Sequence, residues 1–194
     1  MKIILATKNK GKVEEFNTLA EGTSFEFMPL PEEVGALPEE TGKTFKENAF
    51  LKAEFAFNNC DGIPCLADDS GLEVNFLDGA PGIHSARYSK EGTDSSNTLK
   101  LLKKLNGVQK EERKACFKCC LVFISKNSQH IVEGSLEGEI GTSLKGRNGF
   151  GYDPIFAVPS LGLHLAELNQ AEKIKISHRA LAFKKLTIAL KSSK

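Results

Sequence analysis

Two neighbouring aspartates, Asp68 and Asp69, follow a short apolar run in IPCLADDSGLEV, residues 63–74. Carboxylates act as general bases in enzymes and supply the oxygen ligands that Mg²⁺ prefers. If the run is a buried strand, its pleat turns the two side chains to opposite faces of the sheet. We therefore expect divided roles, with one aspartate structural and the other facing a ligand. The plainer alternative is a Ser-Gly turn that Asp68 caps and on which Asp69 is merely exposed.

The second candidate is the polar segment TKNKGK, residues 7–12, between an expected strand and an expected helix. Backbone N–H groups at the start of a helix attract anions, and Gly11 allows close approach. Lys8, Lys10 and Lys12 add positive charge. The pattern is neither G-x-x-x-x-G-K-[ST] nor G-x-G-x-x-G, so neither named nucleotide loop applies. A phosphate site and a solvated turn are equally good interpretations.

The third candidate is GFGYD, residues 149–153, where glycines frame two aromatic residues. An aromatic ring in such a loop can stack on a base, and Asp153 can accept a hydrogen bond from a ring N–H. The alternative is a tight bend at the end of a strand, with Phe150 and Tyr152 packed in the core.

The fourth candidate is EKIKISHRALA, in which Lys173, His178 and Arg179 precede or open the last expected helix. Anions are favoured at a helix start, and arginine offers a planar fork to carbonyl, carboxylate or phosphate groups. A single histidine there is more often a surface residue. The cluster, rather than any one member, therefore suggests a binding site.

Hydrophobic spacing predicts the elements that position these residues. We expect strands near 2–6, 24–28, 63–68, 72–76, 113–125 and 129–141, and helices that begin near 13, 44, 94 and 177. The last two strands suit an antiparallel hairpin across KNSQ. The segment 29–43 is a long loop, whose Glu39 and Glu40 could join Asp69 around Mg²⁺.

The most regular of these helices follows Thr44 and Glu47, which have the spacing of a capping box. Lys52 shares a face of this helix with Phe45 and Ala49. Its ammonium therefore either reaches solvent or points into a site.

The length and composition are those of a globular protein, and we expect a single domain over residues 1–194. Hydrophobic residues make up 40% and charged residues 26% of the chain, and the net charge is +1. A balanced charge excludes an extended basic surface for nucleic acid. No apolar run is long enough to span a membrane, and the N-terminus lacks the pattern of a signal peptide, so we expect a cytoplasmic protein.

Five cysteines include Cys116, Cys119 and Cys120 in KACFKCCLVFIS. A C-x-x-C pair can bind zinc or act in redox chemistry, but on a strand its two thiols point to opposite faces. Reduced core cysteines are the better interpretation.

Read together, these stretches resemble the inosine triphosphate pyrophosphatase family. The resemblance runs from end to end through LATKNKGKVEEF, EETGKTFKENAFLKA, ADDSGLEV, GAPGIHSARY, NGFGYDPIF, AEL and SHRALA. It implies an α/β fold with a mixed, elongated central sheet flanked by helices, and two lobes with a nucleotide cleft between them. It also implies a homodimer that uses Mg²⁺ to hydrolyse ITP, dITP and XTP to the monophosphate and pyrophosphate.

Carried over position by position, the resemblance implies that Asp69 is the general base. It implies that Asp69 and Glu39, or its neighbour Glu40, lie at the metal. The triphosphate would be bound by Thr7, Lys8, Asn9, Lys10, Gly11, Lys12 and Lys52. The nucleotide site would be completed by Ser70, Phe150, Gly151, Tyr152, Asp153, Lys173, His178 and Arg179, with Phe150 stacked on the purine.

There are three rival interpretations, of which one is another enzyme and two belong to other classes of protein. A Maf-like nucleotide pyrophosphatase resembles this family in fold and first polar loop, but SHRALA and GFGYDPIF argue against it. A nucleotide-binding sensor without turnover is disfavoured by the presence of Asp69, Glu39 and Lys52. A nucleic-acid-binding module is disfavoured by the balanced charge.

Overall fold

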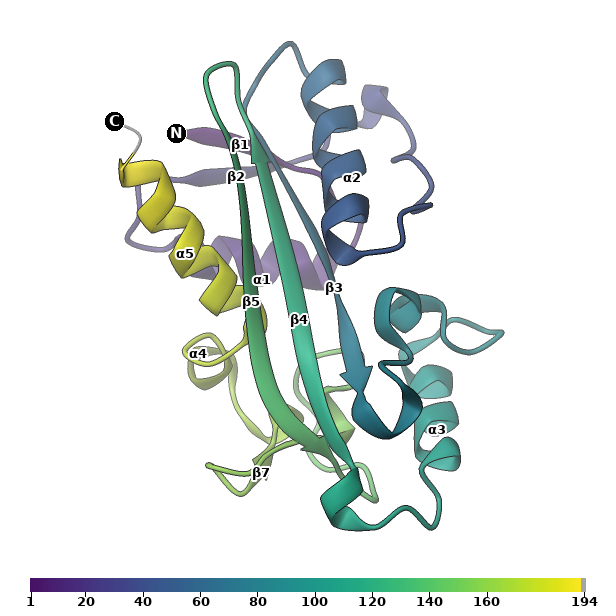
Figure 1. Ribbon diagram of the computed structural model, residues 1–194. Coiled ribbons are helices and arrows are strands. Elements are labelled where there is room, and N and C mark those ends of the chain that lie inside the picture. The colour runs from purple at the N-terminus through teal and green to yellow at the C-terminus, as the bar shows by residue number, and fades with distance from the viewer. Residues whose placement is uncertain (193–194) are drawn as a thin grey trace. The chain divides into compact units, whose positions relative to one another are not determined.

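The computed structural model describes residues 1–192, apart from the side chain of Lys10. Seven strands form one mixed sheet in the order β2-β1-β3-β4-β5-β6-β7. β1 pairs in parallel with β2 and β3, whereas β6 pairs antiparallel with β5 and β7. The expected α/β class, a mixed sheet flanked by helices, is confirmed (Figure 1). The strands are β1 (Lys2–Leu5), β2 (Glu26–Pro29), β3 (Cys65–Val74), β4 (Lys114–Ile124), β5 (Gln129–Ile140), β6 (Phe156–Val158) and β7 (Leu163–His164).

Helices fill the connections between these strands. They are α1 (Lys10–Ala20), α2 (Phe45–Asn59), α3 (Asp94–Lys104), α4 (Gln170–Lys173) and α5 (His178–Ser192). Short 3₁₀ helices lie at Glu32–Val34, Asn75–Leu77, Gly82–Arg87, Lys110–Glu112, Asp153–Ile155 and Leu165–Glu167. Among residues 1–192, no helix is both long and apolar enough to cross a membrane.

The chain divides into two compact units, and the prediction of a single domain stays a prediction. Unit 1 contains Met1–Asp69, Cys119–Gly134 and the residues from Arg179 onward. Unit 2 contains Ser70–Lys118 and Ser135–His178. Three strands, β3, β4 and β5, therefore begin in one unit and end in the other.

Unit 1 packs helices on both faces of its part of the sheet (Figure 1). On one face, Phe16 of α1 and Phe183 of α5 join Leu5, Leu66 and other strand residues in one core. On the other face, the small residues Ala49, Ala53 and Ala56 let α2 lie close to the strands in a second core. These two faces receive the side chains that alternate along β3.

Unit 2 has its own core. Leu101 of α3 and its C-cap residue Leu105 pack with Phe117 of β4, Ile140 of β5 and the segment around Ile155. Arg113 is buried, and its guanidinium donates to the carbonyls of Leu105, Ile140 and Gly141. These bonds tie the start of β4 to the end of β5.

The start of α2 confirms half of the expected capping box. Thr44 is the N-cap residue, and its hydroxyl accepts from the Glu47 N–H at 3.1 Å. The Glu47 carboxylate, however, accepts from the Lys43 N–H at 2.6 Å rather than from Thr44. The helix start is therefore fixed by two bonds, one of which reaches one residue further back than the motif requires.

The segment around the two aspartates corrects one expectation. We predicted two strands, near 63–68 and 72–76, separated by a Ser-Gly turn. β3 instead runs without interruption from Cys65 to Val74, so Asp68 and Asp69 lie inside a strand rather than at its end. The glycine does not break the strand. β1 pairs with β3 only at Cys65 and Leu66, so β4, the other neighbour of β3 in the sheet, is the strand that accompanies this later part.

All five cysteines are buried free thiols. Cys119 and Cys120 follow each other on β4, so Cys119 enters the core with α1 and α5, and Cys120 enters the core with α2. Burial raises the pKa of Cys120 to about 12, which keeps this thiol protonated.

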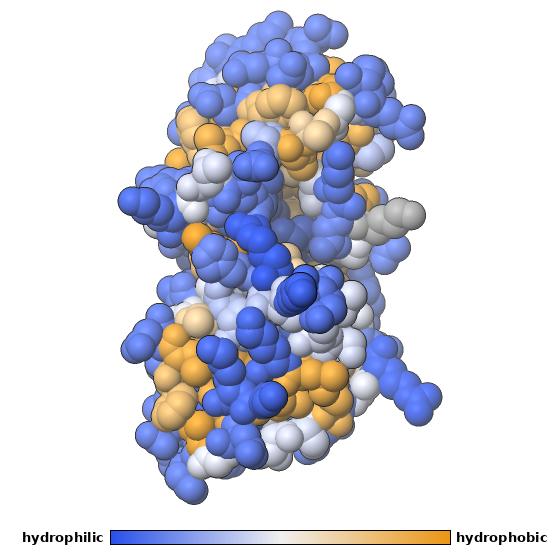
Figure 2. Space-filling model, turned by 90° about the vertical axis from the view of Figure 1, so that its right-hand side faces the viewer, coloured by the Kyte–Doolittle hydropathy of each residue, from blue (hydrophilic) through white to orange (hydrophobic). Residues whose placement is uncertain are grey.

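The surface is mixed. Figure 2 shows one face on which hydrophilic side chains surround smaller hydrophobic patches. Exposed apolar side chains are ordinary on proteins of this kind. The expected homodimer stays a prediction.

Candidate active site

The alternation of β3 gives its two aspartates different partners. Asp69 points to the face covered by α2, where its Oδ1 lies 2.9 Å from the Nζ of Lys52. The same ammonium lies 2.7 Å from Oε1 of Glu40 and donates to the backbone carbonyl of Asp68 at 3.0 Å. One lysine thus joins a strand carboxylate to a loop carboxylate. Of the two outcomes foreseen for Lys52, the ammonium does not reach solvent but is buried between two carboxylates, and its role in a site stays a prediction.

Asp68 points to the opposite face and is buried. Its Oδ2 accepts from Nε of Arg179 at 2.8 Å and lies 3.1 Å from Nζ of Lys12. The Arg179 guanidinium also donates through Nη1 to the carboxylate of Glu15. Asp68 therefore links α1 and α5 to the sheet, which is a structural role, and the expected division of labour between the two aspartates agrees with these contacts.

The surroundings of the two aspartates shift their pKa values in opposite directions. Burial raises the pKa of the Asp69 carboxyl to about 6, although the Lys52 ammonium opposes the rise and Glu40 adds to it. Burial also acts against ionised Asp68, but Arg179, Lys12 and Lys52 outweigh it and hold the pKa of Asp68 well below its usual range. Asp68 is a permanent anion, whereas Asp69 changes its charge near neutral pH. Such a separation is typical of a general base beside a structural acid.

The segment of residues 7–12 forms the N-terminal end of α1. Asn9 is the N-cap, and its Oδ1 accepts from the Lys12 N–H at 3.2 Å. The hydroxyl of Thr7 accepts from the Asn9 N–H at 3.1 Å. Lys8 is exposed, whereas Lys12 turns inward to Asp68. Lys10 opens the helix, but its side chain lies outside the described part of the structure.

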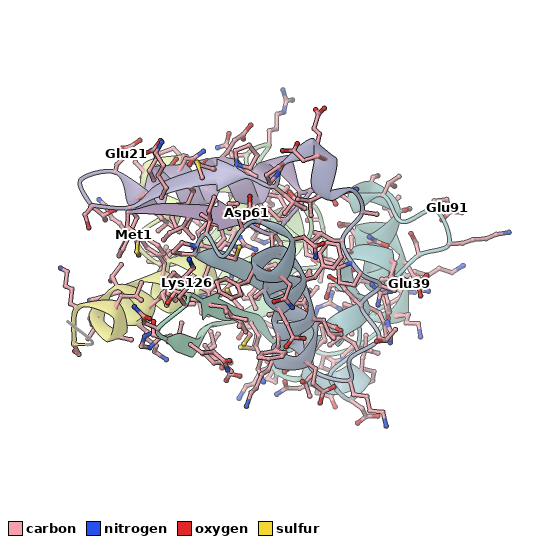
Figure 3. All side chains as sticks on the ribbon, turned by 90° about the horizontal axis from the view of Figure 1, so that it is seen from above. Met1, Glu21, Glu39, Asp61, Glu91 and Lys126 are labelled. Carbon is pink, nitrogen blue, oxygen red and sulfur yellow. The ribbon has the colours of Figure 1, made fainter. Side chains whose placement is uncertain are left out.

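The long loop before α2 carries the two alternatives for a metal ligand. Glu40 bonds to Lys52 beside Asp69, while Glu39, labelled in Figure 3, is exposed. The loop is fixed to α2 by the Gly42 N–H, which donates to Oδ1 of buried Asn48 at 2.8 Å. Geometry therefore favours Glu40 over Glu39 as the partner of Asp69.

In unit 2, the loop of residues 149–153 forms a second cluster. Oδ2 of Asp153 accepts from the Phe150 N–H at 3.0 Å and from Nζ of Lys173 at 2.6 Å. The same ammonium lies 4.8 Å from the centre of the Phe150 ring. A Cβ at Gly149 would come 2.0 Å from Oδ2 of Asp153, so this position requires glycine. Phe150 is half-buried, and its backbone is tightly held.

The other predicted residues of unit 2 have structural contacts. Tyr152 is a core residue, as the plainer interpretation of this loop had it, and its hydroxyl donates to the carbonyl of Ser85 at 2.8 Å. The His178 ring stacks on Phe117, with centroids 4.8 Å apart and planes 8° from parallel. Ser70 follows Asp69 along β3 and is half-buried.

Sequence reasoning missed several residues that position the clusters. Glu15 is buried beside Arg179, and Asp94 accepts a hydrogen bond from the Gly151 N–H. Each contact joins residues far apart in the chain, and nothing local marks Asp94 as the partner of Gly151. For Glu15, a charged residue beside Phe16 on the inward face of α1 was the one available signal.

Fold and clusters together define an α/β protein with the acid and base groups of a candidate hydrolase. The sequence profile of the Ham1 family matches residues 3–189. A dITP/XTP pyrophosphatase from Bacillus licheniformis is 48% identical over 192 residues, which cover 97% of each chain. A dITP/XTP pyrophosphatase from Haemophilus influenzae is 49% identical over 185 residues, covering 93% of this chain and 94% of that protein.

Solved structures of Ham1 proteins also match this chain. The Ham1 protein from Staphylococcus aureus has a TM-score of 0.88 and 38% identity, with 100% of both chains covered. A HAM1 protein from Coxiella burnetii has a TM-score of 0.88 and 41% identity, with 99% of both chains covered. The chain belongs to the Ham1 family. The resemblance drawn from its sequence motifs is confirmed.

Proposed function

We propose that this protein hydrolyses non-standard purine nucleoside triphosphates, among them ITP, dITP and XTP, to the nucleoside monophosphate and pyrophosphate. Its relatives bear the name dITP/XTP pyrophosphatase and align over nearly the whole chain. The observation that carries the proposal is the position of the Asp69 carboxylate, 2.9 Å from the Lys52 ammonium that also binds Glu40 at 2.7 Å. Burial raises the pKa of Asp69, which suits a base that must be ionised at neutral pH and still accept a proton.

The charged residues around Asp68 and Asp69 form the unit 1 cluster, which supplies what phosphoanhydride hydrolysis requires of the protein. Its members are Lys12, Glu15, Glu40, Lys52, Asp68, Asp69 and Arg179. Lys12 and Lys52 stabilise negative charge on the phosphates, and the N-terminal end of α1 offers backbone N–H groups to them. Asp69 takes a proton from the attacking water. The residues proposed to bind the triphosphate are Thr7, Lys8, Asn9, Lys10, Gly11, Lys12 and Lys52.

The charges of this cluster fit a divalent cation. Three cations, Lys12, Lys52 and Arg179, face four carboxylates, those of Glu15, Glu40, Asp68 and Asp69. A triphosphate therefore approaches a buried cluster that has no positive excess while Asp69 is ionised, and it needs a counter-charge.

Glu40 and Asp69 offer the oxygen ligands that Mg²⁺ prefers, and we propose that they hold it. Within residues 1–192, no group of three or more His, Cys, Asp or Glu side chains forms a complete metal site. This agrees with the usual mode of Mg²⁺, which takes one or two carboxylates together with phosphates and water. When bound, Mg²⁺ neutralises phosphate charge and orients the phosphate oxygens.

The unit 2 cluster is proposed to bind the base. Phe150 presents a half-buried ring for stacking. A hypoxanthine or xanthine ring has a 6-keto acceptor where adenine has an amine, so a donor from His178, Arg179 or the backbone near Tyr152 would favour keto purines. The remaining residues proposed for this part are Ser70, Gly151, Asp153 and Lys173.

The contacts of Arg179 with Asp68 and Glu15 already give it a structural role. Its proposed contact with the nucleotide is therefore additional to that role. A nucleotide-pool function would place the protein in the cytoplasm, and we also expect a homodimer.

A panel of nucleoside triphosphates incubated with Mg²⁺ tests the proposal. We expect ITP, XTP and dITP to be cleaved far faster than ATP and GTP, with pyrophosphate as the product. Release of orthophosphate without pyrophosphate would contradict the reaction type. Preference for pyrimidine or standard purine nucleotides would contradict the substrate class and favour a Maf-like activity.

A further inference from the structure

Both backbone polar groups of Gly151 are bound by side chains of α3. The Gly151 N–H donates to Oδ2 of Asp94 at 2.7 Å, and the hydroxyl of Thr98 donates to the Gly151 carbonyl at 3.3 Å. Asp94 and Thr98 are four residues apart and so share one face of the helix. Both contacts lie within unit 2 and join segments more than fifty residues apart.

We propose that Asp94 is a positioning residue for purine selectivity, which sets the Phe150 ring through its bond to Gly151. This inference rests on the proposed function, because it assigns the selectivity of that activity to a residue that does not touch the base.

The loop of residues 149–153 is also fixed on the other side of Phe150, at Asp153. The Phe150 N–H donates to Asp153, and Lys173 bonds to the same oxygen while its ammonium lies over the Phe150 ring. Phe150 therefore sits between an anchor at residue 153 and an anchor at residue 151. Gly151 has φ +63°, a conformation that other residues rarely adopt, and because glycine is itself flexible, the bonds of its N–H and carbonyl to α3 fix the chain direction there.

Phe150 is half-buried, so the bonds of its backbone and of Gly151 contribute to the position of its ring. Tyr152, two residues on, is buried in the core and bonded to Ser85, whereas Phe150 is half-buried. A ring that must present one face to a base loses affinity when its backbone can move, because binding must then order it. The bond between Asp94 and Gly151 removes that freedom before the ligand arrives.

A simpler role for Asp94 is to stabilise α3 alone. Thr93 is the N-cap, so Asp94 is the first helical residue. A negative charge at this position stabilises the helix by interacting with the positive end of its dipole. The two roles separate on substitution. Asp94→Asn removes the charge but keeps a side-chain oxygen at the same distance from the backbone. Asp94→Glu keeps the charge but moves the carboxylate outward by one methylene.

The test combines kinetics with direct binding for the full-length wild-type, Asp94→Asn, Asp94→Glu, Asp94→Ala and Thr98→Val proteins. KM and kcat are measured for ITP and GTP, and inosine monophosphate binding is measured by calorimetry. Inorganic tripolyphosphate, used as an inhibitor, reports the phosphate part alone. Thermal unfolding reports the stability of each variant.

We expect Asp94→Glu and Asp94→Ala to raise KM for ITP about tenfold, the usual effect of one lost hydrogen bond. We also expect them to narrow the preference for ITP over GTP, with kcat within about twofold of wild type. Asp94→Asn should remain near wild type, and Thr98→Val should have a smaller effect because its bond is longer. Tripolyphosphate inhibition should not change.

Folded Asp94→Glu protein with wild-type KM and selectivity would overturn the inference, as would a folded Asp94→Asn protein as impaired as Asp94→Glu. If Asp94→Ala does not fold, the Asn and Glu variants still decide. Wild-type protein that neither cleaves ITP nor binds inosine monophosphate would overturn the proposed function and this inference together. If the wild-type protein cleaves ITP, the proposed function stands whatever the Asp94 variants show.

Discussion

The ammonium of Lys52 lies 2.9 Å from the carboxylate of Asp69 and 2.7 Å from that of Glu40, so one cation holds two carboxylates on the same face of β3. Burial alone would lower the pKa of Lys52, but the two carboxylates outweigh burial and raise it. Lys52 therefore stays charged at neutral pH. Lys52 therefore links Asp69 to the loop that carries Glu40 through two ion pairs.

The pKa of Asp69, which burial raises to about 6, predicts an acid limb in the pH dependence. A general base must be ionised, so kcat/KM should rise about tenfold per pH unit up to roughly pH 6 and then level off. Steady-state rates with ITP from pH 4.5 to 8 check this expectation. A rate that stays level down to pH 4.5 would show that the essential base has an unshifted carboxyl pKa or is not Asp69.

Lys52→Met should move this limb to higher pH. Removal of the nearest cation leaves Asp69 buried beside Glu40, and both conditions raise the pKa of Asp69, by about one unit or more. Lys46→Met is the matched control because Lys46 lies on the same helix but is exposed. The limb of the control should coincide with that of wild type. An unchanged limb in Lys52→Met would mean that Lys52 does not stabilise the ionised base.

Asp68→Asn should cost stability. It leaves the buried guanidinium of Arg179 with one carboxylate fewer, and breaking a buried ion pair on one side costs about 3–5 kcal/mol. Because the pKa of folded Asp68 is depressed, its contribution is present above the usual carboxyl pKa and is lost only under strongly acidic conditions. Urea unfolding at pH 7 measures the loss. Wild-type stability in this variant would contradict the structural role of Asp68.

Glu40→Gln should weaken the response to Mg²⁺, and Glu39→Gln should not. Glu40 lies with Asp69 at Lys52, whereas the neighbouring Glu39 is exposed. We expect the half-saturating Mg²⁺ concentration to rise about tenfold or more in the first variant. Calorimetric titration of Mg²⁺ in the presence of the product nucleotide provides a readout independent of rate. The reverse order of effects would assign the ligand to Glu39.

The sequence predicted local features of unit 1 well. The helix after Thr44 and the opposed aspartates follow from capping and from the two-residue period of a strand, and both depend on near neighbours. The predicted interruption of β3 was wrong because the Ser-Gly pair suggested a turn, whereas β3 continues beside β4 as one strand to Val74.

Contacts between distant segments were not predictable in the same way. That Lys52 meets Glu40, or that Asp94 meets Gly151, depends on tertiary packing that no local pattern encodes. The family resemblance implied roles for individual residues, but it did not indicate that Lys52 contacts Glu40 or that Asp94 contacts Gly151. Only the structure distinguishes Glu40 from Glu39, because their types and positions in the sequence are nearly equivalent.

The most direct measurement compares ITP cleavage by wild type and by Asp69→Asn, with inosine monophosphate, pyrophosphate and orthophosphate measured in the same samples. We predict equal amounts of monophosphate and pyrophosphate from wild type. Asp69→Asn should still bind the nucleotide but cleave it at least about 100-fold more slowly, the usual scale for loss of a general base. Orthophosphate as the first product, or an Asp69→Asn protein as fast as wild type, would contradict the account.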